Sequence, residues 1–274
     1  MIQPLVWQAL LFVPVGSEKH LASAIRLRPD AVILDLEDAV ASEAKPAARS
    51  ALRGAQAELA KAGIDCALRV NGSLRAMVDD LTAADLAKLR AVFVPKCDDT
   101  RGLRNAAELT TGLIALIALI ESPLGLRRSG EIAEVPEVRG LMLGSEDYSA
   151  TLGVNPNKGA LDLVAAELAI AASPRGLLPI GFPGSIANFR ELDLYASQIA
   201  KGRDLGMRAV AAIHPAQLPV IRATLAPTDA EVLWAEKVLA SVEEGGAVFA
   251  LDGAMVDAPV ITRARQISAA SRRI

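Results

Sequence analysis

Eight short apolar runs recur along the first 226 residues, and each is followed by a segment with helical spacing. The runs span residues 9–13, 31–36, 64–70, 91–95, 113–120, 138–143, 177–181 and 208–213. The third run leads to a helical pattern near residues 79–88, and the sixth leads to a long Ala/Leu stretch at 160–172. Because the runs are continuous rather than alternating, they are typical of strands buried on both faces of a parallel sheet. Eight such units predict an α/β fold, a (β/α)8 TIM barrel over residues 1–226.

An open, doubly wound sheet is the alternative arrangement of the same units. It predicts a glycine-rich phosphate turn, G-x-G-x-x-G, after the first strand. The sequence at that point is "VPVGSEK", which lacks the motif. The closed barrel is therefore favoured.

Residues 227–274 do not continue the repeat. They read as a helix, then a glycine-flanked hairpin or loop, then a last helix. We expect a C-terminal extension added to a completed barrel, acting as a lid or a subunit-contact arm.

Composition excludes several classes of protein. A net charge of −3 and an aromatic content of 3% argue against a nucleic-acid interface, which needs a basic face and stacking rings. The longest apolar run, 113–120, is too short to span a bilayer. A signal peptide begins with basic residues, and the first basic residue here is Lys19. We expect a cytoplasmic protein without nucleic-acid or membrane partners.

Cysteine and histidine are scarce. Cys66 and Cys97 have no short paired spacing, which favours a reducing compartment over a disulfide framework. His20 and His214 are the only histidines, so a metal site must rest mainly on carboxylates. That donor set favours a hard ion such as Mg²⁺ or Mn²⁺ over Zn²⁺.

Polar residues gather where the apolar runs end. In a barrel the carboxyl ends of the strands share one rim. The residues expected there are Asp35, Glu37, Asp38, Arg69, Asn71, Lys96, Glu121, Glu146, Asp147 and His214. Several acids beside one arginine and one lysine are costly to bring together without a cation and an anionic ligand.

Most of these residues could also have a structural role instead of a functional one. Asp38 and Glu146 could be solvated loop or helix-cap residues, and Asp35 could be a buried, hydrogen-bonded carboxylate. Arg69 and Lys96 could simply form ion pairs with nearby acids. Glu121 is harder to explain in this way. It directly follows an apolar run, where desolvation of a carboxylate is severe unless a metal or a partner is present.

Eight segments carry a family resemblance. They are "LFVP", "AVILDLEDAV" with Lys45 and Arg49 downstream, "RVN", "VFVPK", "ALIESPLG", "LMLGSEDYSATLG", "AIHPAQL" and "LDGAMVDAPV". Their order resembles that of the citrate lyase β-subunit-like (CoA ester lyase) branch of the HpcH/HpaI aldolase superfamily, over nearly the whole chain. The resemblance implies a TIM barrel that binds Mg²⁺ and cleaves a carbon–carbon bond in a 3-hydroxyacyl thioester.

The resemblance also implies roles for single residues. Glu121 and Asp147 would be the metal ligands, and Arg69 would hold the carboxylate of a keto acid. We further expect substrate contacts from Lys96 and from the backbone amides of Gly144, Ser145 and Glu146.

Three acids would take part in catalysis. The resemblance places Glu37 and Asp38 beside the waters of the metal. Asp257, in "MVDAP", matches an acid that the CoA lyases of the family deliver from the C-terminal arm of a neighbouring subunit. We therefore expect a homo-oligomer, a trimer or a hexamer.

The chain departs from the family pattern at its start and before His214. Gln8 stands where an arginine is usual, near the expected substrate-binding end, and Val15 interrupts the usual Pro-Gly. A lysine typical of the segment before His214 is missing.

The leading hypothesis is a Mg²⁺-dependent lyase for a short 3-hydroxyacyl-CoA, such as malyl-CoA or citramalyl-CoA, giving a keto acid and an acyl-CoA. The alternatives are a citrate lyase β-like subunit that forms oxaloacetate from a carrier-bound citryl thioester among partner subunits, and a pyruvate-type aldolase, with Lys96 as a Schiff-base variant. A non-catalytic keto-acid-binding relative is the last alternative. The sequence fixes neither the acyl group nor the direction of the reaction.

Overall fold

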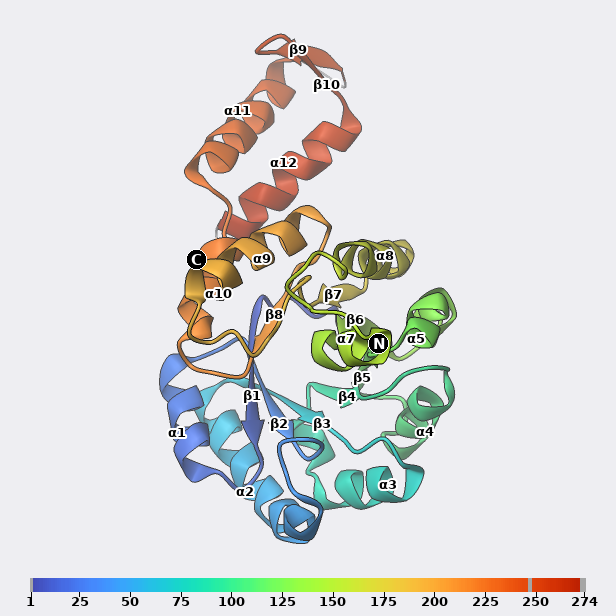
Figure 1. The fold of residues 1–274 in the computed structure, drawn as a ribbon. Helices are drawn as coiled ribbons and strands as arrows, with labels where there is room; N and C mark the ends of the chain where they lie inside the picture. Colours follow the sequence, from blue (N-terminus) through green and yellow to red (C-terminus); the bar gives the residue numbers. More distant parts are fainter. Residues whose placement is uncertain (1, 246–247, 272–274) are drawn as a thin grey trace. The chain divides into compact units, whose positions relative to one another are not determined.

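The computed structural model describes residues 2–245 and 248–271 and contains eight parallel strands around a common axis (Figure 1). The strands are β1 (Ala9–Pro14), β2 (Ala31–Asp35), β3 (Asp65–Arg69), β4 (Ala91–Val94), β5 (Ala115–Ile120), β6 (Val138–Leu143), β7 (Leu178–Ile180) and β8 (Val210–Ala212). Their order is β7-β6-β5-β4-β3-β2-β1-β8, and a bridge between Ile180 and Ala209 joins the two edges. The predicted TIM barrel is confirmed.

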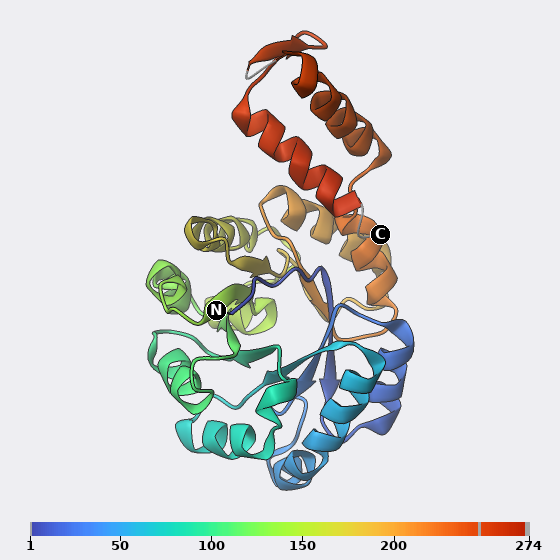
Figure 2. The ribbon, with the colours of Figure 1, turned by 180° about the vertical axis from the view of Figure 1, so that it is seen from behind.

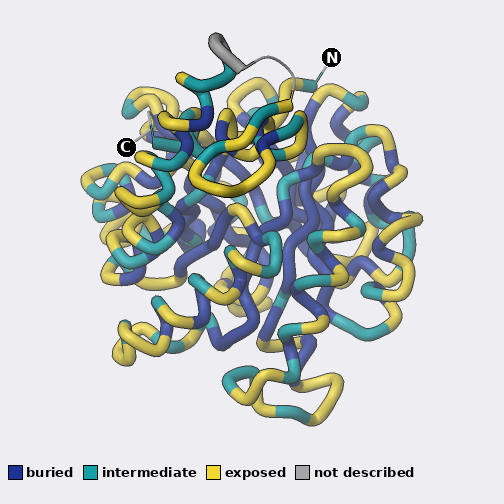
Figure 3. Tube along the Cα trace, turned by 90° about the horizontal axis from the view of Figure 1, so that it is seen from above, coloured by how far each residue is buried: buried dark blue, intermediate teal, exposed yellow. Residues whose placement is uncertain are grey.

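The interior of the barrel is packed with apolar side chains. Leu10, Ile33, Phe93, Ile117 and Ile180 are among the fully buried members of this cluster. Continuous burial along the strands explains their unbroken apolar sequence, because helices cover the outer faces while side chains fill the inside. In Figure 3 the buried segments lie in the interior of the barrel unit, and exposed segments surround them.

The N-terminal segment covers the amino ends of the strands (Figure 2). Leu5 and Trp7 are buried in the interior cluster, and the Trp7 indole Nε1 donates to Asp65 Oδ2 at 2.8 Å. Arg90 donates to the carbonyl oxygens of Gln3 and Pro4. Since this end is filled, the open end is the one at which the strands finish.

Helices follow the strands around the barrel. They are α1 (Glu18–Leu27), α2 (Lys45–Ala62), α3 (Leu74–Ala83), α4 (Arg101–Leu109), α5 (Pro123–Arg127), α6 (Ser129–Ala133), α7 (Ser145–Leu152), α8 (Asp162–Ala172), α9 (Leu192–Asp204) and α10 (Gln217–Leu225), with short 3-10 turns η1 (Ser42–Ala44), η2 (Leu86–Lys88) and η3 (Ser173–Arg175). No described helix is long and apolar enough to cross a membrane.

Two helices differ from the sequence prediction. The helix expected near residues 79–88 begins earlier, at Leu74, because the Ser73 hydroxyl accepts a hydrogen bond from the Ala76 N–H and caps it. The segment after β6 was expected to lead directly to a helix at 160–172. It first forms α7, which ends at Leu152 and is capped by Gly153 in the left-handed conformation (φ 70°).

The chain divides into two compact units, residues 1–222 and 223–274. The second unit contains α11 (Asp229–Gly245), β9 (Phe249–Leu251), β10 (Ala254–Val256) and α12 (Ala258–Ser271). The predicted hairpin or loop is an antiparallel hairpin, turned by Asp252 and Gly253 at positive φ (50° and 79°). Residues 246–247 of that segment lie outside the described residues. The role of this unit as a lid or arm stays a prediction.

Candidate functional site

A pocket of about 370 Å³ opens at the carboxyl ends of the strands. We call it the mouth pocket. Its lining residues are Phe12, Pro14, Asp35, Asp38, Ala39, Arg69, Leu119, Glu121, Met142, Leu143, Gly144, Ser145, Glu146, Asp147, Ile186 and Ile213. Six of the predicted site residues therefore share one pocket with Arg69.

Strand register fixes the position of Arg69. Pro14, Asp35 and Arg69, the last residues of β1, β2 and β3, lie side by side. The guanidinium grips Asp35 with two bonds, from Nε to Oδ1 at 2.8 Å and from Nη2 to Oδ2 at 2.6 Å, and stacks 5.1 Å above the Phe12 ring. Asp35 is 1% exposed, and although burial acts to lower the pKa of Arg69, the hydrogen bonds to Asp35 and the nearby acids raise it above its ordinary value. Asp35 thus has the structural role that the sequence left open.

Glu37 and Asp38 share the remaining guanidinium nitrogen of Arg69. Nη1 lies 2.8 Å from Glu37 Oε2 and 3.2 Å from Asp38 Oδ2. Glu37 is also paired with the Lys96 ammonium at 3.0 Å. Burial raises the pKa of Glu37, against the lowering effect of Arg69 and Lys96. The Asp38 side chain stays 58% exposed, so it is the member of this group free to move.

Glu121 follows β5 and is 6% exposed. Its Oε2 accepts the backbone N–H of Lys96 at 2.6 Å, which is possible because Lys96 adopts a left-handed conformation (φ 54°). Burial raises the pKa of Glu121 to about 7 despite this hydrogen bond, and the charges of Glu37 and Asp147 add to the effect. The carboxylate is held in place but its charge is poorly compensated.

Gly144 makes room for Glu121. A Cβ atom at this position would lie 2.4 Å from Glu121 Cγ and 2.9 Å from Oε1. Its backbone N–H donates to the Ile120 carbonyl at 3.0 Å, so Gly144 does not offer this donor to a ligand. The predicted hydrogen bond from the Gly144 amide to the substrate is therefore not available. Gly144 instead leaves space for the Glu121 side chain.

The first turn of α7 brings Ser145, Glu146 and Asp147 to the mouth pocket. Gly144 precedes the helix without a side-chain cap, so the first amides of α7 have no intrahelical acceptor and form a site that favours anions. The Glu146 carboxylate accepts from the Ser185 hydroxyl at 2.5 Å. Glu146 thereby anchors the loop after β7, which the sequence did not predict.

The side of the pocket formed after β7 and β8 is apolar. Ile186 and Ile213 line it, while the imidazole of His214 stacks on Phe189 with 5.0 Å between the ring centroids. His214 follows the carboxyl end of β8, at the rim as expected, but it is not among the residues that line the mouth pocket. Sequence reasoning missed both isoleucines, since no chemical signal distinguishes them from core residues.

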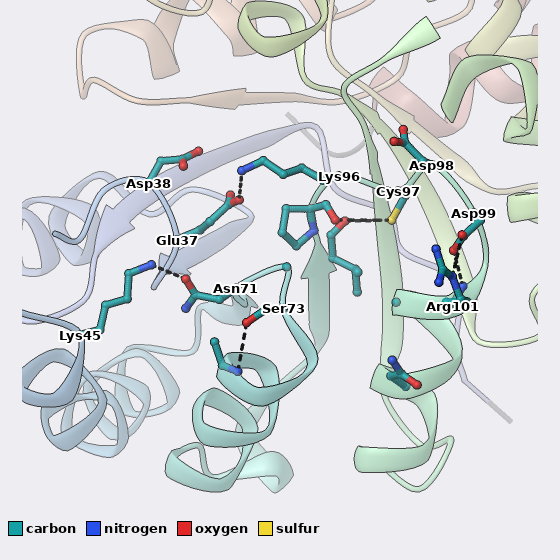
Figure 4. Close-up of a pocket in the computed structure, with 16 residues that line it drawn as sticks. Glu37, Asp38, Lys45, Asn71, Ser73, Lys96, Cys97, Asp98, Asp99 and Arg101 are labelled. Atoms are coloured by element: carbon teal, nitrogen blue, oxygen red, sulfur yellow. Dashed lines mark hydrogen bonds and ion pairs between the residues drawn. The ribbon is translucent and has the colours of Figure 1, made fainter. Parts of the chain in front are cut away.

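A second cavity of about 650 Å³ lies beyond the Glu37–Lys96 pair, between the loops after β2, β3 and β4 (Figure 4). The Lys45 ammonium points into it and donates to Asn71 Oδ1. Asn71 Nδ2 donates to Asp80 at 2.7 Å, and Asp80 also accepts from Arg49 Nε at 2.8 Å. Because Asp80 is fully buried, this network fixes the loop after β3 that carries Asn71.

Asp257 and Gln8 are not among the residues that line the mouth pocket. Asp257 belongs to the second unit, where its Oδ1 accepts the Val260 N–H at 3.4 Å at the start of α12. Gln8 precedes β1 and therefore lies at the amino end of that strand, about 20 Å from Pro14 at 3.3 Å per residue. The expectation that the change at Gln8 affects the substrate-binding end was wrong.

The donor chemistry of the mouth pocket fits a hard cation. Glu121 and Asp147 offer carboxylate oxygens, and no group of three or more acidic, histidine or cysteine side chains arranged for a metal occurs in the described part of the chain. Two protein ligands leave several coordination positions to water and ligand oxygens, which Mg²⁺ favours and a closed zinc site does not.

Comparison with known proteins agrees with this geometry. The sequence model for HpcH/HpaI aldolase/citrate lyase matches residues 8–215, which include all eight strands. The chain belongs to this family. The predicted family and the predicted class of enzyme, a lyase, are confirmed.

Two curated relatives cover almost the whole chain. The citrate lyase subunit beta-like protein of Deinococcus radiodurans is 31% identical, over 96% of this chain and 97% of the relative. The (3S)-malyl-CoA thioesterase of Cereibacter sphaeroides is 31% identical, over 98% of this chain and 95% of the relative.

Solved structures are also similar over nearly the whole chain. One of them is protein CitE from Mycobacterium tuberculosis in complex with magnesium, acetoacetate and coenzyme A. The TM-score is 0.81 at 30% identity, over 97% of this chain and 98% of that chain.

Proposed function

We propose that this protein is a Mg²⁺-dependent lyase that cleaves a short 3-hydroxyacyl-CoA, such as malyl-CoA or citramalyl-CoA, into a 2-keto acid and an acyl-CoA. The observation that carries the proposal is the arrangement of Glu121, Asp147 and Arg69 around one pocket at the open end of the barrel. Two similar proteins support the choice of Mg²⁺ and a CoA thioester as ligands. One is named a (3S)-malyl-CoA thioesterase, and the other was solved in complex with magnesium, acetoacetate and coenzyme A.

Glu121 and Asp147 would hold the metal ion. Their fit is supported by the raised pKa of Glu121, since a nearby divalent cation would supply the charge compensation that burial and its acidic neighbours deny it. When bound, Mg²⁺ supplies Lewis-acid stabilisation of negative charge that develops on the substrate oxygens.

Arg69 would hold the carboxylate of the keto acid. Its Nε and one terminal nitrogen are committed to the buried Asp35, which keeps the guanidinium plane fixed. The other terminal nitrogen, Nη1, lies 2.8 Å from the buried Glu37 and 3.2 Å from the exposed Asp38, and an incoming ligand can replace the Asp38 carboxylate. The first amides of α7, from Ser145 and Glu146, would donate to the same ligand.

Glu37, Asp38 and Asp257 are proposed to handle protons. Asp38 borders both cavities and is exposed enough to exchange protons with solvent. Lys96 is proposed to orient Glu37 rather than to form a Schiff base. Its ammonium donates to Glu37, which raises the pKa of Lys96 and keeps it protonated, whereas a Schiff-base lysine needs a lowered pKa.

Metal titration of three variants tests the proposal. Glu121→Ala and Asp147→Ala should lose Mg²⁺ binding and Mg²⁺-dependent cleavage of malyl-CoA and citramalyl-CoA. Glu108→Ala removes an exposed carboxylate on α4 and should behave like the unmodified protein. Normal Mg²⁺ affinity in both pocket variants would rule out the assigned metal site.

Subunit mixing tests the proposal that Asp257 completes the site of a neighbouring subunit in a homo-oligomer. Asp257→Ala and Glu121→Ala should each be inactive alone. Hybrids formed by co-expression should recover part of the activity, because some sites then combine an intact pocket with an intact arm. A monomeric, fully active protein, or hybrids without activity, would contradict the shared site.

A further inference from the structure

The loops after β7 and β8 follow a junction of the barrel at which little strand pairing is present. β7 and β8 are the two edges in the hydrogen-bonded order of the strands, and an isolated bridge between Ile180 and Ala209 joins them. We call residues 181–191 the β7 loop and residues 213–216 the β8 loop. Strand pairing alone therefore does little to fix one loop relative to the other.

The side chain of Gln217 joins these two loops. Gln217 is the first residue of α10 and is fully buried. Its Nε2 donates to the carbonyl oxygen of Ile186 in the β7 loop at 2.8 Å. Its Oε1 accepts the backbone N–H groups of Ile213 and His214 in the β8 loop, each at 3.0 Å. One amide thus satisfies three main-chain groups, a role that needs a donor and an acceptor on the same side chain.

Two of these three groups belong to the isoleucines that form the apolar wall of the mouth pocket. The neighbouring Ser185 is held from the other side of the β7 loop. Its N–H donates to Asn157 Oδ1 at 3.0 Å, and its hydroxyl donates to Glu146 on α7 at 2.5 Å. Loss of the Gln217 amide should therefore release the wall without moving α7 and its Asp147.

We propose that Gln217 is a positioning residue for the substrate, which holds the β7 and β8 loops together so that Ile186 and Ile213 form one wall. Gln217 is not itself among the residues that line the mouth pocket, and it acts through the main chain of the two isoleucines. The inference rests on the proposed function, because the wall serves the reaction only if the mouth pocket holds the substrate.

Gln217→Met removes all three hydrogen bonds and nearly preserves the volume of the side chain. The wall contacts the substrate both before and during the reaction, so its displacement weakens both states alike. The KM for citramalyl-CoA or malyl-CoA should rise by about 10- to 100-fold, while kcat changes by less than about threefold. The Mg²⁺ affinity should stay within about twofold, because the proposed ligands Glu121 and Asp147 have no contact with Gln217.

Gln56→Met is the matched control for loss of a buried amide. Gln56 is also fully buried, accepts the Asp85 N–H at 2.8 Å and donates to the Asp85 carbonyl at 3.1 Å. Asp85 precedes β4 and therefore belongs to the opposite end of the barrel. Both methionine variants should lower the urea midpoint, but Gln56→Met should leave KM unchanged. An equal rise of KM in both variants would overturn the positioning role.

Gln217→Glu separates the contacts of the amide and provides a second variant should Gln217→Met not fold. A carboxylate still accepts from Ile213 and His214, and the N-terminus of α10 favours an acid, but the donor to the Ile186 carbonyl is lost. Gln217→Glu should therefore raise KM as well. A normal KM in this variant would show that the bond to the β7 loop does not position the substrate.

Calorimetric titration with pyruvate and glyoxylate at saturating Mg²⁺ separates failure of the inference from failure of the proposed function. If the unmodified protein binds a keto acid but cleaves neither thioester, the lyase proposal fails, and binding weakened by about tenfold in Gln217→Met still supports the inference. If it cleaves a thioester and Gln217→Met retains a normal KM, the inference alone is overturned. Neither cleavage nor keto-acid binding by the unmodified protein would overturn both.

Discussion

Replacing Gly144 with alanine should displace Glu121. The new Cβ would lie 2.4 Å from Glu121 Cγ, although carbon atoms in favourable contact are about 3.5–4.0 Å apart. The side chain of Glu121 must therefore move by about 1 Å or more. Because its Cγ is close to the backbone, the movement also disturbs the hydrogen bond from the Lys96 N–H.

The displacement should weaken metal binding more than folding. Overpacking costs about 1–3 kcal/mol, and loss of the hydrogen bond to a charged group costs about as much again. Moving Glu121 toward water, however, relieves part of the burial that raises its pKa. We therefore expect a loss of about 1–3 kcal/mol in the free energy of unfolding, and a Mg²⁺ affinity lower by about 10- to 100-fold.

Two measurements separate these effects: urea unfolding without metal, analysed at constant m-value, and calorimetric titration with Mg²⁺. Gly54→Ala is the matched control, because its new Cβ meets no atom within 4 Å. Since Gly54 lies within α2, this substitution should stabilise the fold by about 0.5–1 kcal/mol. If Gly144→Ala retained both stability and Mg²⁺ affinity, Glu121 would not occupy the position described here.

Two further predictions concern pH and a buried network. In the folded protein the pKa of Glu121 is about 7, above the ordinary value of 4.5. Without metal, the free energy of unfolding should therefore fall by up to about 3 kcal/mol as pH rises from 4.5 to 7. Mg²⁺ affinity should rise over the same interval and level off above it, and Glu121→Gln should remove the contribution of Glu121 to both dependences. Asp80→Ala should destabilise the fold by about 3–5 kcal/mol in urea unfolding, because it leaves Arg49 without its buried partner. The control Asp79→Ala should change the free energy of unfolding by less than about 0.5 kcal/mol, because Asp79 is exposed and lies 3.8 Å from Arg49. A comparable loss of stability in Asp80→Ala and Asp79→Ala would contradict this account.

The barrel could be predicted from the sequence because strands buried on both faces must consist almost entirely of apolar residues. Residues such as Ile33, Phe93 and Ile117 must be apolar to pack in the interior, whatever the function. The boundary of α3 was less accessible, because it depends on the hydroxyl of Ser73 capping the helix. A short helix such as α7 has too few residues for periodicity to show.

The polar half of the candidate site was also accessible to sequence reasoning. Carboxylates and Arg69 at strand ends are unusual enough to be noticed, and topology brings them to one end. The apolar half was not, since Ile186 and Ile213 look like ordinary core residues until the loops are placed. The function of Gly144 was equally hidden, because it depends on the position of a side chain from the neighbouring strand.

The mouth pocket combines a cost to folding with a capacity to bind. The positive charge of Arg69 is committed mainly to Asp35, which leaves Glu121 buried close to Glu37 and Asp147 with little compensation. An apolar residue at position 121 would be easier to bury, but it could not hold a cation. Such a carboxylate is explained by a ligand that neutralises it. Binding to the folded state alone then returns stability that grows with the logarithm of ligand concentration above the Kd, so metal affinity and stability at this end of the barrel must change together.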